Sequence, residues 1–176
     1  MIQSYEQALD YMFEFESSKD DSLEIIKKAL DIFWNPQNDF KIIHIAGTNG
    51  KGSVSKMLFS ILKQAWKKVW VFTSPHLVDI RERFESDIWI ISKIDFIWYV
   101  TEISQCYIKL AYFEKCFLIS QLYFKDQRCE YVIIETWVWG TYDTTNIVVP
   151  ILTCITSISY DHQWLLWDTI DEISAH

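Results

Sequence analysis

The spacing of apolar residues along the chain alternates between two periods. Stretches in which apolar residues recur every three or four positions have the spacing of one helix face. They predict helices at 4–16, 22–33, 53–65 and 95–127 (with one break near residue 110), and a last helix from Thr169 onward. Short runs rich in β-branched residues lie between them and predict strands at 41–46, 69–73, 131–135 and 152–157.

The order of these elements indicates the fold class. Strands that alternate with longer helices are typical of an α/β fold, in which helices flank a parallel sheet. Asp21 or Ser22 is the expected N-cap of the second helix and Asp168 that of the last, and Asn35-Pro36 interrupts the helical pattern. The sequence ends inside the last predicted helix, so we expect residues 1–176 to form one truncated domain, incomplete at its carboxyl terminus.

Composition narrows the class of protein. The net charge of −8 and the absence of basic runs argue against nucleic acid as a partner. No apolar run approaches the ~20 residues of a transmembrane helix, and the amino terminus lacks the pattern of a signal peptide, so no membrane association is expected. Four cysteines without CxxC spacing suit core packing in a reducing cytoplasm: Cys106, Cys116, Cys129 and Cys154.

The strongest local motif is the segment GTNGKGS, which follows a predicted strand and precedes a predicted helix. Backbone N–H groups of such a turn point at phosphate oxygens, and the helix N-terminus adds its dipole. The motif differs from GxxxxGK[ST] because Gly52 separates Lys51 from Ser53. The sequence therefore predicts a phosphate-binding loop (P-loop), and a glycine turn that only joins strand to helix is the alternative. The candidate ATP-binding residues are Gly47, Thr48, Asn49, Gly50, Lys51, Gly52 and Ser53.

Three polar residues stand at or just past the ends of predicted strands. These are Ser74, Glu135 and His162, which a parallel sheet would bring to one edge. Ser74 could instead serve a turn before Pro75, and His162 could be a capping or core histidine. Glu135 is harder to explain structurally, because an unpaired acid is costly to bury.

Other polar residues near this edge have structural explanations by default. His44 is interpreted as a core or hydrogen-bonded residue, and His76 as a support for the loop around Ser74. The charged run that includes Asp79, Arg81, Glu82 and Arg83 is expected to be a solvated loop.

Four motifs in order give the chain a family resemblance. HIAGTNGKGSV, FTSPHLVDIRERF, ETWVWGTYDTTN and SISYDHQWLLWDT resemble segments of folylpolyglutamate synthases and dihydrofolate synthases, members of the Mur ligase superfamily. The resemblance implies a fold like the Mur ligase central domain. It also implies an activity, in which ATP and Mg²⁺ convert the carboxylate of folate or dihydropteroate to an acyl phosphate. The amine of L-glutamate then displaces the phosphate.

The resemblance also implies residue roles. Lys51, Glu135 and His162 match catalytic positions, and Ser74, Glu135 and His162 match magnesium ligands. The positions that match substrate contacts are Phe113, Glu114, Tyr142, Asp143 and Thr144. A monomer in the cytoplasm is expected.

The chain also departs from the family. Phe117 stands where the family has threonine, and the sequence stops one position short of the family's magnesium-binding lysine. The glutamate ligase domain at the family's carboxyl terminus is absent, so the fragment is expected to be inactive alone.

Tryptophan is unusually frequent and glycine rare, with nine and four residues. Six of the tryptophans stand where the family characteristically has glycine: Trp34, Trp66, Trp70, Trp137, Trp139 and Trp167. One hypothesis is that UGA codons read as glycine have been translated as tryptophan, because glycine suits turns that need a positive φ. The alternative is a genuine sequence whose ligand loop is filled by indole rings.

Three functions stay open at this point. The first is the folate–glutamate ligase, either dihydrofolate synthase, folylpolyglutamate synthase or both. The second is another Mur-superfamily amide ligase that acts on a different acid, against which TSPHL and RERF argue. The third is a nucleotide-binding fragment without ligase activity.

Overall fold

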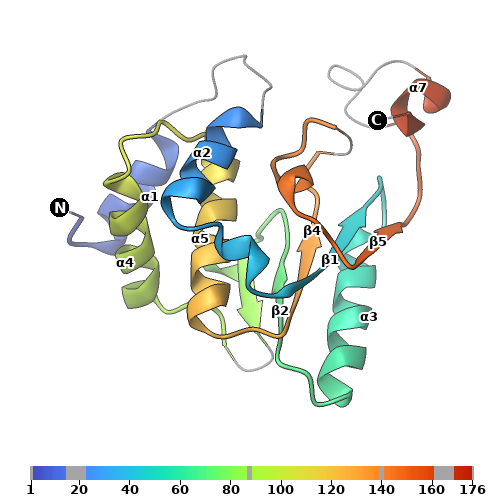
Figure 1. Cartoon of the computed structure of the whole chain (residues 1–176), viewed down its shortest axis with the longest axis horizontal. Helices are drawn as coiled ribbons and strands as arrows, with labels where there is room; N and C mark the ends of the chain where they lie inside the picture. Colours follow the sequence, from blue (N-terminus) through green and yellow to red (C-terminus); the bar gives the residue numbers. More distant parts are fainter. Residues whose placement is uncertain (1, 15–22, 87–88, 139–140, 161–168, 176) are drawn as a thin grey trace.

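The computed structural model describes residues 2–14, 23–86, 89–138, 141–160 and 169–175. Its centre is a five-stranded sheet of order β3-β2-β4-β1-β5 (Figure 1). The strands are β1 (Lys41–Ala46), β2 (Val69–Phe72), β3 (Phe84–Ser86), β4 (Tyr131–Glu135) and β5 (Leu152–Ile155). Strands β2, β4, β1 and β5 pair in parallel, which confirms the predicted α/β class. The short strand β3, which the sequence pattern did not predict, pairs antiparallel with β2.

Helices cover both faces of the sheet. They are α1 (Tyr5–Phe13), α2 (Glu24–Ile32), α3 (Lys51–Gln64), α4 (Lys93–Ser104), α5 (Tyr112–Asp126) and α7 (Ile170–Ser174). Helix α3 packs on one face through Phe59, against alternate strand residues such as Ile45 and Val71. Helices α1, α2, α4 and α5 form a thicker layer on the other face (Figure 1), where Phe72 and Ile134 enter the main core. No helix among the described residues is long and apolar enough to cross a membrane.

The boundaries of several helices differ from those that the pattern predicts. Helix α3 begins at Lys51, two residues before the predicted start, because Gly50 adopts a left-handed conformation and serves as its N-cap. The break near residue 110 separates α4 from α5. Helix α7 is capped by Thr169, whose side chain accepts a hydrogen bond from the Glu172 N–H, whereas Asp168 was predicted. Asp168, Asp21 and Ser22 lie outside the described residues.

Two of the tryptophans occupy left-handed positions at helix ends. Trp34 follows α2 with φ 63° and Trp66 follows α3 with φ 57°. Each end has the paired hydrogen bonds of a Schellman motif, and at α3 the Lys67 N–H donates to the Leu62 carbonyl at 3.0 Å. Both indoles are largely exposed, at 84% and 96%. These two positions therefore have the geometry that favours glycine.

The other described tryptophans at family glycine positions do not share this geometry. Trp70 lies within β2, is 5% exposed and packs edge-on against Tyr123 with ring centroids 4.9 Å apart. Trp137 is not among the described residues with positive φ. Trp139 and Trp167 lie outside the described residues. Of the four described positions, the backbone argument for glycine thus holds at 34 and 66.

Candidate active site

The glycine-bearing loop joins the end of β1 to the start of α3 and is held by the segment that follows β5. The Thr48 N–H donates to the Ser157 carbonyl at 2.7 Å, and the Asn49 N–H donates to Ser157 Oγ at 3.3 Å. Gly47 has φ +127°, and a β-carbon built on it would lie 2.2 Å from Thr156 Oγ1. A side chain is therefore excluded at Gly47 in this loop conformation.

Lys51 lies at the N-terminus of α3 and turns back over the loop. Its Nζ donates to the Gly47 carbonyl at 2.7 Å and to the Thr48 carbonyl at 3.3 Å. The ammonium group thus stands at the positive end of the helix dipole. A positive charge at this place has no acidic partner among the described ion pairs, so the loop favours an anionic ligand.

Glu135 ends the central strand β4 beside this loop. Its side chain is 4% exposed, and Oε2 has no hydrogen-bond partner among the described residues. A β-carbon built on Gly52 would lie 3.7 Å from this oxygen, so Glu135 approaches the first turn of α3 closely. Burial raises the pKa of Glu135 from 4.5 to about 7, and the nearby Lys51 charge opposes the shift.

Ser74 follows β2, the strand next to β4, and lies close to Glu135. A backbone hydrogen bond from Ser74 reaches the Glu135 carboxylate. The Ser74 Oγ is buried and, like Glu135 Oε2, lacks a hydrogen-bond partner among the described residues. The sheet therefore brings the predicted pair together, as the strand order requires. His162, the third predicted member, lies outside the described residues.

The two buried oxygens fit a magnesium ion. Magnesium is usually held by one or two protein oxygens together with phosphates and waters. The described residues contain no group of three or more His, Cys, Asp or Glu side chains that could hold a metal on their own. An ion bound by Ser74 and Glu135 would therefore depend on oxygens of a ligand in the adjacent loop.

The predicted substrate contacts form a second group, next to the first. Phe113, in the first turn of α5, is 5% exposed and stacks on Trp137 with ring centroids 5.1 Å apart. Tyr142 is 41% exposed, and Thr144 begins a short 3₁₀ helix η3 (Thr144–Ile147). The sheet and α5 thus bring the stacked rings of Phe113 and Trp137, the aromatic platform, to the same edge as Glu135.

The carboxylates of two acids in this group accept hydrogen bonds from other residues of the chain. Asp143 is 3% exposed; its Oδ2 accepts from the Trp137 and Val138 N–H groups, and its Oδ1 accepts from the Thr145 N–H and Oγ1. Glu114 Oε2 accepts from the N–H of Ala111, the N-cap residue of α5, at 2.7 Å. Burial raises the pKa of both carboxyl groups. Both acids thus organise the loops around the platform.

His44 is hydrogen-bonded in the core, as predicted. It is 6% exposed, and its Nε2 lies 2.7 Å from Thr145 Oγ1. Burial lowers the pKa of His44 to about 4, so the ring is neutral at physiological pH. It connects β1 to the loop that Asp143 organises.

The charged segment after Ser74 is not the solvated loop that the sequence suggested. It contains the 3₁₀ helix η2 (Ile80–Arg83), closed by a capping box between Asp79 and Glu82. Arg83 is 5% exposed, and its Nε donates to His76 Nδ1 at 2.9 Å. His76 therefore supports this loop, as expected. Nothing in the sequence RERF distinguishes the buried Arg83 from the partly buried Arg81 and Glu82, which is why the pattern missed it.

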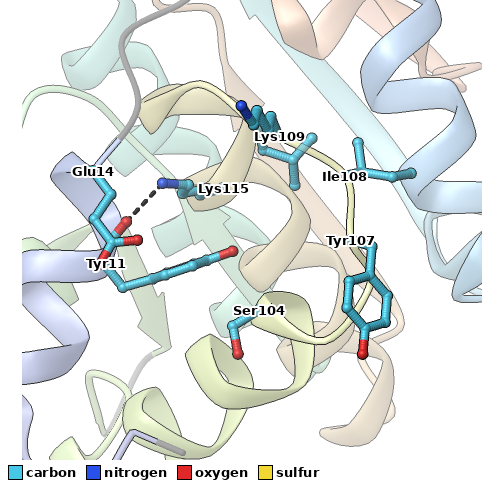
Figure 2. Close-up of a pocket in the computed structure, with 8 residues that line it drawn as sticks. Tyr11, Glu14, Ser104, Tyr107, Ile108, Lys109 and Lys115 are labelled. Atoms are coloured by element: carbon cyan, nitrogen blue, oxygen red, sulfur yellow. Dashed lines mark hydrogen bonds between the residues drawn. The ribbon is translucent and has the colours of Figure 1, made fainter.

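A separate pocket of about 360 Å³ lies in the helical layer (Figure 2). It is bounded by the end of α1, the α4–α5 connection and the start of α5. Its buried cation, Lys115, donates to the carbonyls of Tyr11 and Met12 at 2.7 and 3.4 Å. Lys115 thus caps the carboxyl end of α1, and the pocket contains none of the predicted site residues.

Fold and site together define a class of protein. A parallel α/β sheet carries a strand–loop–helix unit for an anionic ligand, with unpaired buried oxygens and an aromatic platform at the same edge. No family model matches the sequence. The chain is 34% identical over 159 residues to the dihydrofolate synthase/folylpolyglutamate synthase of Bacillus subtilis, covering 85% of this chain and 37% of that protein.

Solved structures of similar enzymes also match the chain. E. coli FolC in complex with DHPP and ADP matches with a TM-score of 0.88 and 31% identity, covering 97% of this chain and 42% of that one. A folylpolyglutamate synthase (FPGS) complex with AMPPCP and folate matches with a TM-score of 0.92 and 27% identity, covering 99% of this chain and 45% of that one. Over most of its length the chain is thus similar to an amino-terminal part of folylpolyglutamate synthases and dihydrofolate synthases. It spans less than half the length of these three relatives.

Proposed function

We propose that this chain is the ATP-binding part of a ligase that joins L-glutamate to the carboxylate of folate or dihydropteroate. The observation that carries the proposal is the pair of unpartnered buried oxygens, Glu135 Oε2 and Ser74 Oγ, beside the N-terminus of α3. A carboxylate buried without a partner is costly unless a cation or ligand completes it. The relatives solved with AMPPCP or ADP support a nucleotide as that ligand.

Each group of the site has a defined task in this reaction. The backbone N–H groups at the N-terminus of α3 and the Lys51 ammonium bind and orient the ATP phosphates, whereas the Thr48 and Asn49 N–H groups donate to Ser157 and shape the loop. Ser74 and Glu135 hold Mg²⁺ against those phosphates, with His162 assigned to a second ion. When bound, Mg²⁺ neutralises negative charge on the transferred phosphoryl group.

The chemistry consists of two displacements. A carboxylate oxygen of the substrate attacks the γ-phosphorus, the bond to the bridging oxygen breaks, and ADP leaves. The amine of glutamate then attacks the acyl carbon, inorganic phosphate leaves, and the amine releases a proton. Lys51 stabilises the charge on the phosphoryl oxygens in the first displacement.

The substrate side is formed by α5 and the loop after β4. Phe113 offers a ring face for a pterin, and Tyr142 and Thr144 provide direct polar contacts. Asp143 and Glu114 position these groups, because their carboxylates already accept hydrogen bonds from the chain. In this structure the Trp137 indole stacks on Phe113, and a glycine at 137 would leave that ring face open.

The proposal also covers the domains of the enzyme, its oligomeric state and its location in the cell. Residues 1–176 belong to its ATP-binding domain, and a further domain completes the glutamate site. The enzyme acts as a monomer in the cytoplasm, without nucleic acid or membrane as a partner.

Phosphate release by the complete enzyme tests this function. With MgATP and glutamate present, we expect release that depends on dihydropteroate or folate and that yields one amide product per phosphate. A Lys51→Ala variant is the matched control and should release none. Release that needs only a non-folate acid would indicate another amide ligase, and nucleotide binding without release in any mixture would contradict the ligase assignment.

A further inference from the structure

Arg83 is a buried cation that forms no ion pair among the described residues. Its side chain is 5% exposed, and Nη1 is buried without a hydrogen-bond partner. No carboxylate of the described residues lies within ion-pair distance of it. Burying an unpaired charge is strongly unfavourable, so a site that keeps one is built for an anion that arrives with a ligand.

The neighbouring charges of the same loop are already paired. Arg81 forms an ion pair with Asp79, with Nη2 and Oδ2 2.9 Å apart. The Glu82 carboxylate accepts from the N–H groups of Leu77, Val78 and Asp79. The capping box therefore uses both acids of the loop. The charge of Arg83 lowers the pKa of the Glu135 carboxyl group, but the described ion pairs do not join these two side chains.

The place of Arg83 identifies the kind of anion. Its carbonyl accepts from the Thr73 N–H at 3.4 Å, which fixes Arg83 beside the residue that precedes Ser74. Its guanidinium carbon lies 5.6 Å from the centroid of the Tyr112 ring, and Tyr112 precedes Phe113 at the start of α5. Arg83 thus stands between the magnesium candidates and the aromatic platform, whereas Lys51 serves the phosphate loop.

We propose that Arg83 binds the carboxylate of the pteroyl substrate and holds it beside Ser74 and Glu135 for attack on the γ-phosphorus. This inference rests on the proposed ligase function and gives a role to one residue of RERF, to which the resemblance assigned no individual role. Arginine suits the task because its planar guanidinium matches the two oxygens of a carboxylate, and its Nε is already oriented by His76.

The test removes the charge from each partner in turn. Binding of pteroate and of its carboxamide, which lacks the negative charge, is measured by calorimetry on the complete enzyme and on Arg83→Met. The wild-type protein should bind the carboxamide roughly 10- to 100-fold more weakly, the size of one charge-assisted hydrogen bond. Arg83→Met should bind pteroate as weakly as the wild-type protein binds the carboxamide, and should not distinguish the two ligands.

Two controls separate this role from others. Arg81→Met removes a paired charge of the same loop and should keep the preference for pteroate. MgAMPPCP affinity should be unchanged in Arg83→Met, whereas a γ-phosphate ligand role would lower it. Arg83→Met loses the hydrogen bond from Nε to His76, so the thermal midpoint of the ligand-free variant is measured to show that it is folded at the assay temperature.

The outcomes distinguish the two levels of the proposal. A preference for pteroate that survives in Arg83→Met, or a loss confined to MgAMPPCP, overturns the role of Arg83 and leaves the ligase function intact. A wild-type enzyme that binds MgAMPPCP but not pteroate contradicts the proposed substrate class. If Arg83→Met does not fold, Arg83→Gln removes the charge but keeps an N–H donor for His76, and an undiminished preference for pteroate in that variant overturns the proposal.

Discussion

Replacing Trp66 by glycine should stabilise the chain. Trp66 has φ 57° and is 96% exposed, so the substitution relieves backbone strain and removes almost no packing. A left-handed conformation costs a non-glycine residue roughly 1–2 kcal/mol. About 0.4–1 kcal/mol of this gain is offset, because glycine gives the unfolded chain more conformational entropy. The net gain in the free energy of unfolding is therefore about 0.5–1 kcal/mol, and Trp34→Gly should add a similar amount because the two sites are independent.

The assay is thermal or urea unfolding of single and double variants. A gain of about 0.5–1 kcal/mol corresponds to a rise of roughly 1–4 °C in Tm for a chain of this size. Trp66→Ala is the matched control, because alanine removes the indole but keeps the strain, and its midpoint should stay near that of the parent. Arg128→Gly should gain like Trp66→Gly, since Arg128 has φ 53° after α5. Trp66→Gly and Trp66→Ala variants of equal stability would refute the reasoning.

The remaining predictions concern the core, the phosphate loop and the acids of the site. Trp70→Gly should destabilise the chain by at least about 3–5 kcal/mol, the cost of truncating a buried tryptophan, and a stability equal to the parent in urea titrations would mean that the indole does not pack as described. Gly47→Ala should abolish MgAMPPCP binding in calorimetric titrations, because the added methyl group clashes with Thr156. In Gly52→Ala the methyl group makes only an ordinary contact, so this variant should bind MgAMPPCP more tightly than Gly47→Ala does. Ser74→Ala should raise the magnesium concentration needed for half-maximal phosphate release, and an unchanged magnesium titration would remove Ser74 from the metal site. Burial raises the pKa of Glu135 to about 7, above the ordinary 4.5, so the folded chain binds this proton more tightly than the unfolded chain does. Wild-type stability should therefore fall relative to Glu135→Gln as the pH rises from about 4.5 to about 7, and parallel urea midpoints across that range would show that the carboxyl group is not perturbed.

The elements that the sequence could predict are those with a strong local signal. The strand–loop–helix unit at GTNGKGS and the acid that ends β4 follow from apolar periodicity and glycine spacing, and the parallel order then places Ser74 beside Glu135. Strand β3 escaped prediction because three residues carry too little periodicity. The interpretation that the structure changed most is the charged loop. Arg83 contacts His76 and Tyr112, and these contacts decide that it is more buried than Arg81. Neither contact can be inferred from the residues of RERF alone.

The tryptophans illustrate the same limit. The sequence treated six positions alike, but the backbone separates them: at 34 and 66 a left-handed φ favours glycine, and at 70 the indole fills the core. Local motif matching cannot see this difference, because it depends on φ and on packing. The loop after β4 is a further case, since the four hydrogen bonds to Asp143 give this predicted substrate contact an organising role.

The central claim is that this site forms an acyl phosphate from a pteroyl carboxylate, and an isotope measurement tests it most directly. The complete enzyme is given MgATP, glutamate and a substrate whose carboxylate oxygens are labelled with ¹⁸O, and the released phosphate is analysed by mass spectrometry. Attack of the carboxylate on the γ-phosphorus transfers one labelled oxygen, so the account predicts one ¹⁸O in each phosphate released. Amide product accompanied by unlabelled phosphate would contradict it.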